Sequence, residues 1–155
     1  MSKYLKDLKS AFHETDLEII ERHSKQPVLR VPSDQLVPIA QYLKENTGFD
    51  HAVSVSVIDD LANNQFLIAY HLASVKKPEL HGVVFTLEVV SPRGTPSTPS
   101  LTAIWPSVEF HEREGWEMFG IKFEGHPKLE RLLLPESWEG GYPLRKDFKQ
   151  KEEAK

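Results

Sequence analysis

The chain changes character near residue 91, and this change limits its fold more than any other feature. Up to residue 90, apolar residues recur at helical or alternating spacings, the patterns of regular elements that bury one face. Residues 91–106 are then interrupted by four prolines and one glycine. Because proline and glycine end regular structure, the sequence predicts a domain at 1–90, a proline-rich connector at 91–106 and a tail at 107–155.

Two helices are predicted in the domain. Between residues 4 and 12, apolar residues recur at steps of three and four, which places them on one stripe of a helix. The second helix covers residues 36–43. Ser33 is expected to cap its N-terminus, and Gly48 lies just beyond its C-terminal end, where glycine is favoured.

Five strands are predicted from short apolar runs, at residues 17–20, 28–31, 53–57, 66–72 and 83–90. The first two are interpreted as a strand pair, and Asn63-Asn64 stands where a hairpin turn would join the third and fourth. The order helix, two strands, helix, three strands buries best as an α+β two-layer sandwich. In it, the helices pack on one face of a mixed sheet.

The last third of the chain, from Trp105 onward, differs in kind. It holds all three tryptophans and five of the eight glycines, but only one short helix is predicted there, around residues 108–119. The rest of the tail is expected to be extended and irregular. Large aromatic side chains with little regular structure to bury them indicate a surface for a partner protein. A tail that wraps its own domain is the alternative interpretation of the same residues.

Composition excludes several classes of function. A net charge of -4, from 19 basic and 23 acidic residues, provides no positive field for nucleic acid. The absence of cysteine excludes disulfides, thiolate nucleophiles and iron-sulfur clusters ligated by this chain alone. Residues 1–12 lack the apolar block of a secretory signal, and no apolar run approaches the roughly 20 residues of a membrane span. We therefore expect a cytosolic protein, for which any contact with a membrane is indirect.

Short motifs for catalysis or metal binding are incomplete. His111-Glu112 begins like a zinc-binding helix, but Gly115 stands where the second histidine is needed. The spacings Gly115 to Gly120 and Gly120 to Gly125 match a phosphate-binding loop without its lysine and hydroxyl residue. No Gly-x-Ser-x-Gly motif is present. The sequence therefore predicts no catalytic, cofactor-binding or metal-binding residue on this chain.

Four glutamates, at positions 109, 112, 114 and 117, are the remaining candidates for acid-base chemistry. On a helix, however, Glu109 and Arg113 lie four residues apart and are expected to form an ion pair. Acidic residues near the beginning of a helix also suit its dipole. A structural role for these glutamates is therefore favoured.

Residues 112–147 contain a much longer pattern. It comprises Glu112-Arg113-Glu114, Met118-Phe119-Gly120-Ile121, Gly125-His126-Pro127, Leu132 to Glu136, Trp138-Glu139-Gly140 and Pro143 to Asp147, preceded by Trp105-Pro106. This stretch resembles the signature of the thirty-kilodalton, or C-type, subunit family of NADH:quinone oxidoreductase. Glu117, Glu130 and the turn at Gly141-Tyr142 depart from the common pattern. These departures leave open whether the branch is that of NADH:quinone oxidoreductase, F420H2 dehydrogenase or membrane-bound NiFe hydrogenase.

The resemblance implies a non-catalytic structural subunit in the peripheral arm of a proton-translocating oxidoreductase. Family members are similar in packing an extended C-terminal segment on the forty-nine-kilodalton, or D-type, subunit, near the iron-sulfur and quinone end of that arm. FMN and iron-sulfur clusters are then expected on other subunits, with no cofactor on this chain. The residues expected at the partner interface are Glu112, Arg113, Glu114, Phe119, Gly120, His126, Pro127, Trp138, Leu144, Arg145, Lys146 and Asp147.

Two arginines are expected to have specific roles in this interface. Arg113 is expected to hold one carboxylate in a bidentate pair, which would orient the segment. Arg145 is expected to reach a carboxylate or carbonyl cluster on the partner, and the alternative is that it caps this chain's own surface. Apolar anchors are expected from Phe119, Ile121, Phe123, Leu132, Leu133, Leu134 and Trp138.

Two other classes of function fit the sequence. A freestanding oxidoreductase or hydrolase would use the tail as a lid over its active site, and turnover by the purified chain would indicate it. A binding module outside any respiratory complex would be indicated if neither a D-type nor an iron-sulfur partner were encoded beside it.

Overall fold

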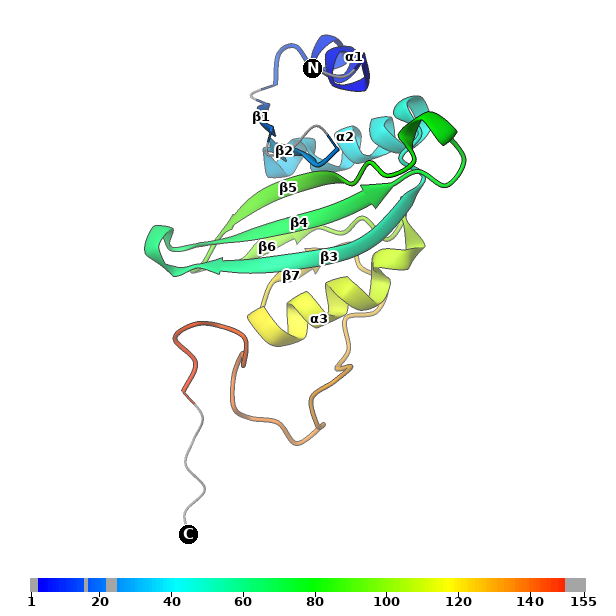
Figure 1. The fold of residues 1–155 in the computed structure, drawn as a ribbon. Coiled ribbons are helices and arrows are strands. Elements are labelled where there is room, and N and C mark those ends of the chain that lie inside the picture. The colour runs from blue at the N-terminus through cyan, green and yellow to red at the C-terminus, as the bar shows by residue number, and fades with distance from the viewer. Residues whose placement is uncertain (1–2, 16, 22–24, 150–155) are drawn as a thin grey trace.

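The computed structural model describes residues 3–15, 17–21 and 25–149 (Figure 1). Its helices are α1 (Lys3–Ala11), α2 (Leu36–Tyr42) and α3 (Glu109–Phe119). Its strands are β1 (Glu18–Glu21), β2 (Pro27–Val31), β3 (His51–Asp60), β4 (Gln65–Ala73), β5 (Phe85–Pro92), β6 (Ser97–Pro99) and β7 (Lys122–Glu124). Short 3-10 turns lie at Ser33–Gln35, Leu61–Asn63, Pro78–Leu80 and Pro106–Val108, and α2 continues into a π-helical turn at Leu43–Thr47.

The first five strands form one mixed sheet in the order β1-β2-β5-β4-β3. Strands β2 and β5 run parallel, while the other neighbouring strands run antiparallel. Strands β3 and β4 form a hairpin whose turn contains Asn64 in the left-handed region, with φ of 54°. Asparagine tolerates this conformation, so the turn lies where the sequence predicts it. The α+β fold with a mixed sheet is thereby confirmed.

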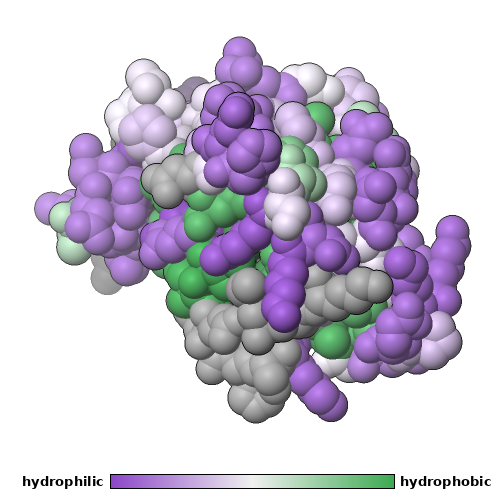
Figure 2. Space-filling model, turned by 90° about the horizontal axis from the view of Figure 1, so that it is seen from above, coloured by the Kyte–Doolittle hydropathy of each residue, from purple (hydrophilic) through white to green (hydrophobic). Residues whose placement is uncertain are grey.

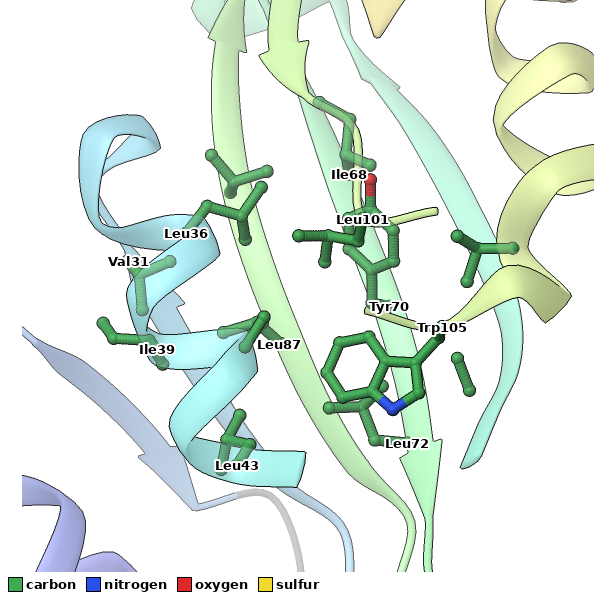
Figure 3. Close-up of a cluster of buried hydrophobic side chains, with 14 of the residues drawn as sticks. Val31, Leu36, Ile39, Leu43, Ile68, Tyr70, Leu72, Leu87, Leu101 and Trp105 are labelled. Carbon is green, nitrogen blue, oxygen red and sulfur yellow. The ribbon is translucent and has the colours of Figure 1, made fainter. Parts of the chain in front are cut away.

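The strand register places most of the buried apolar side chains of the sheet on one face. Directly opposed residues form two buried rows, Val31, Val89 and Ile68 in one and Leu29, Leu87 and Tyr70 in the other. The buried side of α2 packs on this face through Leu36, Ile39 and Leu43 (Figure 3). Burying a side chain of this size contributes about 1.5–3 kcal/mol, so this layer supplies much of the stability of the fold.

The other two helices pack on the same face. On α1, the ring of Tyr4 lies 6.2 Å from that of Phe85, centroid to centroid, and at the end of α3 the ring of Phe119 lies 5.9 Å from that of Phe66. The opposite face carries polar groups, among them Arg30, which pairs with Glu88 at 2.7 Å. The predicted layering, with helices on one face of the sheet, is confirmed. Viewed from above, the surface is mostly hydrophilic, with hydrophobic side chains gathered near its centre (Figure 2).

The ends of the second helix differ from the prediction on one side. Ser33 is not a side-chain cap: it begins the 3-10 turn that leads into α2, and no capping bond from a side chain is formed there. Pro32 precedes this turn in an extended conformation, so the chain enters the helix through a backbone turn instead. At the other end, Gly48 adopts φ of 98° as predicted. A Cβ there would meet only the flexible end of the Lys77 side chain, at 2.4 Å, so the left-handed backbone is the main reason for glycine.

The connector and the first half of the tail enter the core, which the sequence does not predict. Strand β6, in the connector, pairs in parallel with β7, in the tail. Leu101 and Trp105 are buried among residues of the sheet (Figure 3), and the indole Nε1 of Trp105 donates to the Phe49 carbonyl at 3.2 Å. Phe123, on β7, is only 1% exposed. One hydrophobic core therefore continues across residue 91.

Replacing Trp105 with alanine tests this shared core. The substitution leaves a cavity between the connector and the sheet, so Trp105→Ala is expected to lower the free energy of unfolding by about 3–5 kcal/mol, measured by urea denaturation. Leu61→Ala, at an exposed position in the β3-β4 turn, is the control and should change it by about 0.5 kcal/mol or less. A loss of similar size in both variants would contradict a core that extends to residue 105.

Candidate functional site

The C-terminal surface, defined as the outer side of α3 together with residues 126–148, is the candidate functional site. Ten large hydrophobic side chains are exposed among the described residues, and half of them lie here: Phe110, Leu132, Leu133, Tyr142 and Leu144. Exposed apolar side chains in such number mark sites of protein contact. The backbone that carries them has little regular structure, so the groups that hold it in place determine its geometry.

Glu117, on α3, binds the backbone of the three leucines that follow residue 131. Its Oε1 accepts from the N–H groups of Leu132 and Leu134 at 3.2 and 2.9 Å, and its Oε2 accepts from that of Leu133 at 2.9 Å. The Glu117 side chain is 5% exposed. A buried carboxylate needs hydrogen-bond donors, and three backbone N–H groups supply them without another ionised side chain. The leucine segment is thus held against α3.

Arg113, one helical turn before Glu117, binds the carbonyls of the same segment. Its Nε donates to the Glu130 carbonyl at 3.1 Å and its Nη2 to the Arg131 carbonyl at 3.0 Å, while its guanidinium lies over the Phe110 ring. The expected ion pair with Glu109 and the expected bidentate bond to a carboxylate are both replaced by these bonds. The planar fork of an arginine fits two successive carbonyls as well as one carboxylate. Local sequence does not reveal which of these partners is in reach.

The end of α3 holds a second part of the tail. The N–H of Leu144 donates to the Met118 carbonyl at 3.2 Å, and Arg145 Nε donates to the Phe119 carbonyl at 2.7 Å. Carbonyls in the last turn of a helix have no partner within the helix, so the tail satisfies them. Gly120 permits this approach: its φ is 75°, and a Cβ there would come within 2.4 Å of the Tyr142 ring. Arg145 thus binds this chain's own groups.

A double ion pair fastens the tail to the sheet. Arg93, just after β5, donates to both carboxylate oxygens of Asp59 at 2.8 and 3.0 Å and to both of Asp147 at 2.5 and 3.0 Å. Asp59 also accepts from the N–H of Lys146 at 2.7 Å. The Arg93 guanidinium holds the pKa values of both aspartates below their ordinary range. Asp59 is buried on β3, so the tail is tied to the edge of the sheet by a charged group that must remain paired.

Glu112 joins α3 to the sheet and to the connector. It is fully buried, and its Oε1 accepts from the Tyr70 hydroxyl at 2.9 Å and the Leu101 N–H at 2.8 Å, while its Oε2 accepts from the Ser100 hydroxyl at 2.5 Å. Burial raises the pKa of the Glu112 carboxyl, and its hydrogen bonds offset this only in part. No arginine or lysine pairs with Glu112 among the described residues, so hydrogen bonds to neutral groups satisfy this carboxyl.

His126 and Trp138 are placed by hydrogen bonds within the chain. The Nδ1 of His126 accepts from the Lys128 N–H at 3.0 Å, so Nε2 is the nitrogen that donates to the Glu109 carbonyl at 3.1 Å. Trp138 Nε1 donates to the Gly141 carbonyl at 2.8 Å. A pocket of about 270 Å³ opens beside this loop, and its walls include Trp116, Trp138 and Tyr142. Among the described residues, no group of three or more His, Asp or Glu side chains is placed to hold a metal ion.

The structure brings the predicted site residues together around α3, but it gives them different environments. Glu112 and Phe119 lie inside the protein, whereas Glu114, Leu144 and Lys146 are exposed. Asp59 and Arg93 were missed because they precede the tail by many residues and no short motif links them to Asp147. For Glu117 the sequence favours a structural role over acid-base chemistry and shows a departure from the family pattern, but it does not indicate which groups the carboxylate binds. Its three backbone partners depend on how the chain returns to α3.

Comparison with known proteins places this arrangement in a family. Residues 29–154 match the sequence profile described as respiratory-chain NADH dehydrogenase, 30 Kd subunit. The chain belongs to this family. The C-type subunit of NADH-quinone oxidoreductase from Moorella thermoacetica is 38% identical over 149 residues, which cover 96% of this chain and 95% of that protein. The C-type subunit of F(420)H(2) dehydrogenase from Methanosarcina mazei is 36% identical over 118 residues, covering 76% and 72% of the two chains.

Solved structures of similar proteins share the fold. A chain of the membrane-bound sulfane sulfur reductase, an archaeal respiratory membrane complex, superposes with a TM-score of 0.81 at 25% identity, covering 95% of this chain and 84% of that one. A trypsin-resistant fragment of Nqo5 superposes with a TM-score of 0.68 at 26% identity, covering 82% and 97%. The family is therefore that of the C-type subunit in oxidoreductase complexes of this kind, and the resemblance seen in residues 112–147 is confirmed.

The raised pKa of Glu112 predicts a pH dependence of stability. The folded state binds this proton more tightly than the unfolded state, so the free energy of unfolding falls as pH rises from the unfolded pKa to the raised folded pKa. Glu112→Gln cannot ionise and should lack this fall. The difference in free energy of unfolding, variant minus wild type, is expected to increase with pH across this interval and then level off, measured by denaturation at successive pH values. Glu45→Gln, at an exposed position, is the control, and a difference that shrinks with rising pH would contradict the prediction.

The bonds of Glu117 predict local protection of the leucine segment. Glu117→Ala removes the acceptor of three backbone N–H groups, so residues 130–134 should open more often and trypsin should cut after Arg131 roughly tenfold faster. Glu136→Ala, at an exposed position in the same part of the tail, is the matched control and should leave the rate unchanged. Equal rates in the two variants would show that Glu117 does not hold the segment.

Proposed function

We propose that this chain is a structural subunit in the peripheral arm of a proton-translocating NADH:quinone oxidoreductase. It docks through the C-terminal surface on the neighbouring forty-nine-kilodalton, D-type subunit and supports electron transfer to quinone without an active site of its own. The observation that carries this proposal is the anchoring of the tail: buried charged groups of this chain hold its backbone, while Leu133 and Leu144 remain 61% and 51% exposed.

The anchoring supports docking for an energetic reason. Arg113, Glu117 and Arg93 are all engaged within the chain, so they need not be desolvated or ordered when a partner binds. Ordering a flexible segment costs affinity, and a segment that is already held avoids that cost. The leucines it presents are the apolar contacts that a partner surface can bury. Glu114 and Lys146 would then contribute polar contacts around them.

The proposed subunit carries no cofactor. The sequence has no cysteine to ligate an iron-sulfur cluster, so such clusters would be bound by other subunits. The family membership implies that FMN is bound there as well. Among the described residues, no helix is both long and apolar enough to cross a membrane. We propose that the chain sits peripherally on the cytoplasmic side and reaches the membrane through the complex.

The second candidate is the equivalent subunit of an F420H2 dehydrogenase or of a membrane-bound hydrogenase. Two comparisons support this second candidate: the sequence identity with a subunit of F420H2 dehydrogenase and the structural similarity to a chain of an archaeal respiratory complex. The two candidates share the docking surface and differ in the electron donor. Oxidation of NADH, of reduced F420 or of reduced ferredoxin by the complex purified through this chain distinguishes them.

Leu133→Asp tests the docking surface. A charged side chain at the centre of an apolar contact should cost at least about 2 kcal/mol of binding free energy, or roughly a thirtyfold loss of affinity. Affinity purification of the tagged full-length chain from native membranes should therefore recover the D-type subunit with the wild type and lose it with the variant. Val75→Asp is the matched control, because Val75 is 68% exposed but lies in the loop after β4, outside the C-terminal surface.

Two results would count against the proposal. Full recovery of the partner with Leu133→Asp would show that the interface lies outside the C-terminal surface. Turnover of an electron donor by the purified chain alone would instead support a freestanding oxidoreductase.

Arg145→Ala adds a further comparison. Since Arg145 binds the Phe119 carbonyl, reduced recovery of the partner is expected to accompany faster proteolysis of the tail.

A further inference from the structure

The two edges of the five-stranded sheet are protected very differently. Strand β1, at one edge, has four residues, and Glu18 on it pairs with Arg30 at 2.9 Å. Strand β3, at the other edge (Figure 1), has ten residues. Short strands and charged residues are the usual ways in which proteins keep a sheet edge from pairing with another chain. Only the β1 edge has both.

The sequence of β3 lacks such protection along most of its length. Residues 51–58 read HAVSVSVI and contain no Asp, Glu, Lys, Arg or Pro. The register of β3 with β4 shifts between Ala52 and Ser54, a bulge near one end, and the pairing is then regular to Asp60. A long, uncharged and regular edge would expose a protein to aggregation if nothing covered it.

The chain covers this edge at its two ends and leaves the middle open. Near the beginning of β3, Ser107 Oγ donates to the Ala52 carbonyl at 2.9 Å. Near its end, the Lys146 N–H donates to the Asp59 carboxylate, which brings the tail beside this end of the strand. Between them, at residues 53–58, the described part of the chain supplies no backbone hydrogen bond from outside the sheet. Val53 and Ile58 are 49% and 47% exposed.

A groove runs beside the open part of the edge. It has a volume of about 270 Å³ and lies between β3 and α3, with Val55 and Val57 on one side, His111 and Glu114 on the other, and Leu144 among the walls. Leu144 also belongs to the C-terminal surface, so the groove is continuous with the proposed docking site. Glu114 is exposed, and within the described residues its side chain has no hydrogen bond or ion pair.

We infer that the outer edge of β3 accepts an extended strand of the neighbouring subunit, which adds a sixth strand to the sheet. Its backbone would pair with residues 53–58, its apolar side chains would lie over Val55 and Val57, and a basic side chain would meet Glu114. This inference rests on the proposed function and adds a second contact to it. A second copy of this chain fits less well, because it would bring another Glu114 to the same groove.

Hydrogen exchange on the full chain tests the added strand. Backbone amides within residues 53–58 that point away from β4 are expected to exchange at least roughly tenfold more slowly in the complex purified from native membranes than in the chain alone. Unchanged exchange of all these amides in a complex that retains its subunits would overturn the inference.

A charge on the edge strand gives an independent test. Ser56 is exposed on β3, and Ser56→Lys should reduce recovery of the partner subunits from native membranes about tenfold, because lysine on an edge strand opposes further pairing. Ser56→Thr keeps the edge uncharged and should leave recovery at the wild-type level. Val75→Lys adds a surface charge away from the edge and should also leave recovery unchanged. Unaltered thermal unfolding of each variant confirms that the fold is intact.

The outcomes separate the two proposals. Full recovery with Ser56→Lys together with loss in Leu133→Asp would refute strand addition and leave the docking surface standing. Failure to recover the D-type subunit even with the wild-type chain would refute both. A dimer of the purified chain, detected by light scattering and dissociated by Ser56→Lys, would replace the partner's strand with that of a second copy.

Discussion

The buried carboxyl of Glu112 is the interaction on which the second half of the molecule depends. It receives hydrogen bonds from Tyr70 on β4 and from Ser100 and Leu101 in the connector. A carboxyl removed from water is stable only where such donors converge, so α3 has one favourable position against the sheet. The same hydrogen bonds hold the connector in place, and Trp105 of the connector lies in the core. The core that results is shared by residues on both sides of the proline-rich stretch.

Once α3 is placed, its exposed side organises the tail. Arg113 and Glu117 bind carbonyls and N–H groups of successive residues at 130–134, and the last carbonyls of the helix bind residues 144 and 145. Most charged side chains of this region thus form hydrogen bonds with the chain's own backbone, while several leucines remain in contact with solvent. This arrangement favours a protein-binding surface over a reactive centre. Ionised groups whose hydrogen bonds are already made to the backbone are poorly placed for acid-base chemistry.

The sheet edge and the tail are parts of one structure. Asp59 follows the exposed part of β3 and, through Arg93, holds Asp147 of the tail. Leu144, three residues before Asp147, borders the groove beside β3. A partner that covered Leu144 would therefore also meet the open edge of β3. Both features would become buried together, which would account for the uncharged stretch at residues 51–58 in a chain whose other sheet edge is protected.

Periodicity in the sequence determined the regular elements of the first ninety residues. Alternating valines predicted β3, the apolar stripe at 36–43 predicted α2, and Asn63-Asn64 predicted the hairpin turn, because these signals act between near neighbours. The long pattern at 112–147 identified the family by itself. The three-residue strands β6 and β7 gave no such signal, and α2 begins from a 3-10 turn in place of a serine cap. These features depend on groups that meet only after the chain has folded.

What the sequence determined by itself was the order of the elements in the first ninety residues, the fold class and the family. What only the tertiary structure decided was the partner of each charged residue. Arg113 binds two carbonyls instead of a carboxylate, Arg93 joins two aspartates that are far apart in the sequence, and Glu117 binds three N–H groups of a returning loop. Hydrogen bonds act over about 3 Å and require alignment, so their partners are set by the folded path of the chain and are not encoded in local spacing.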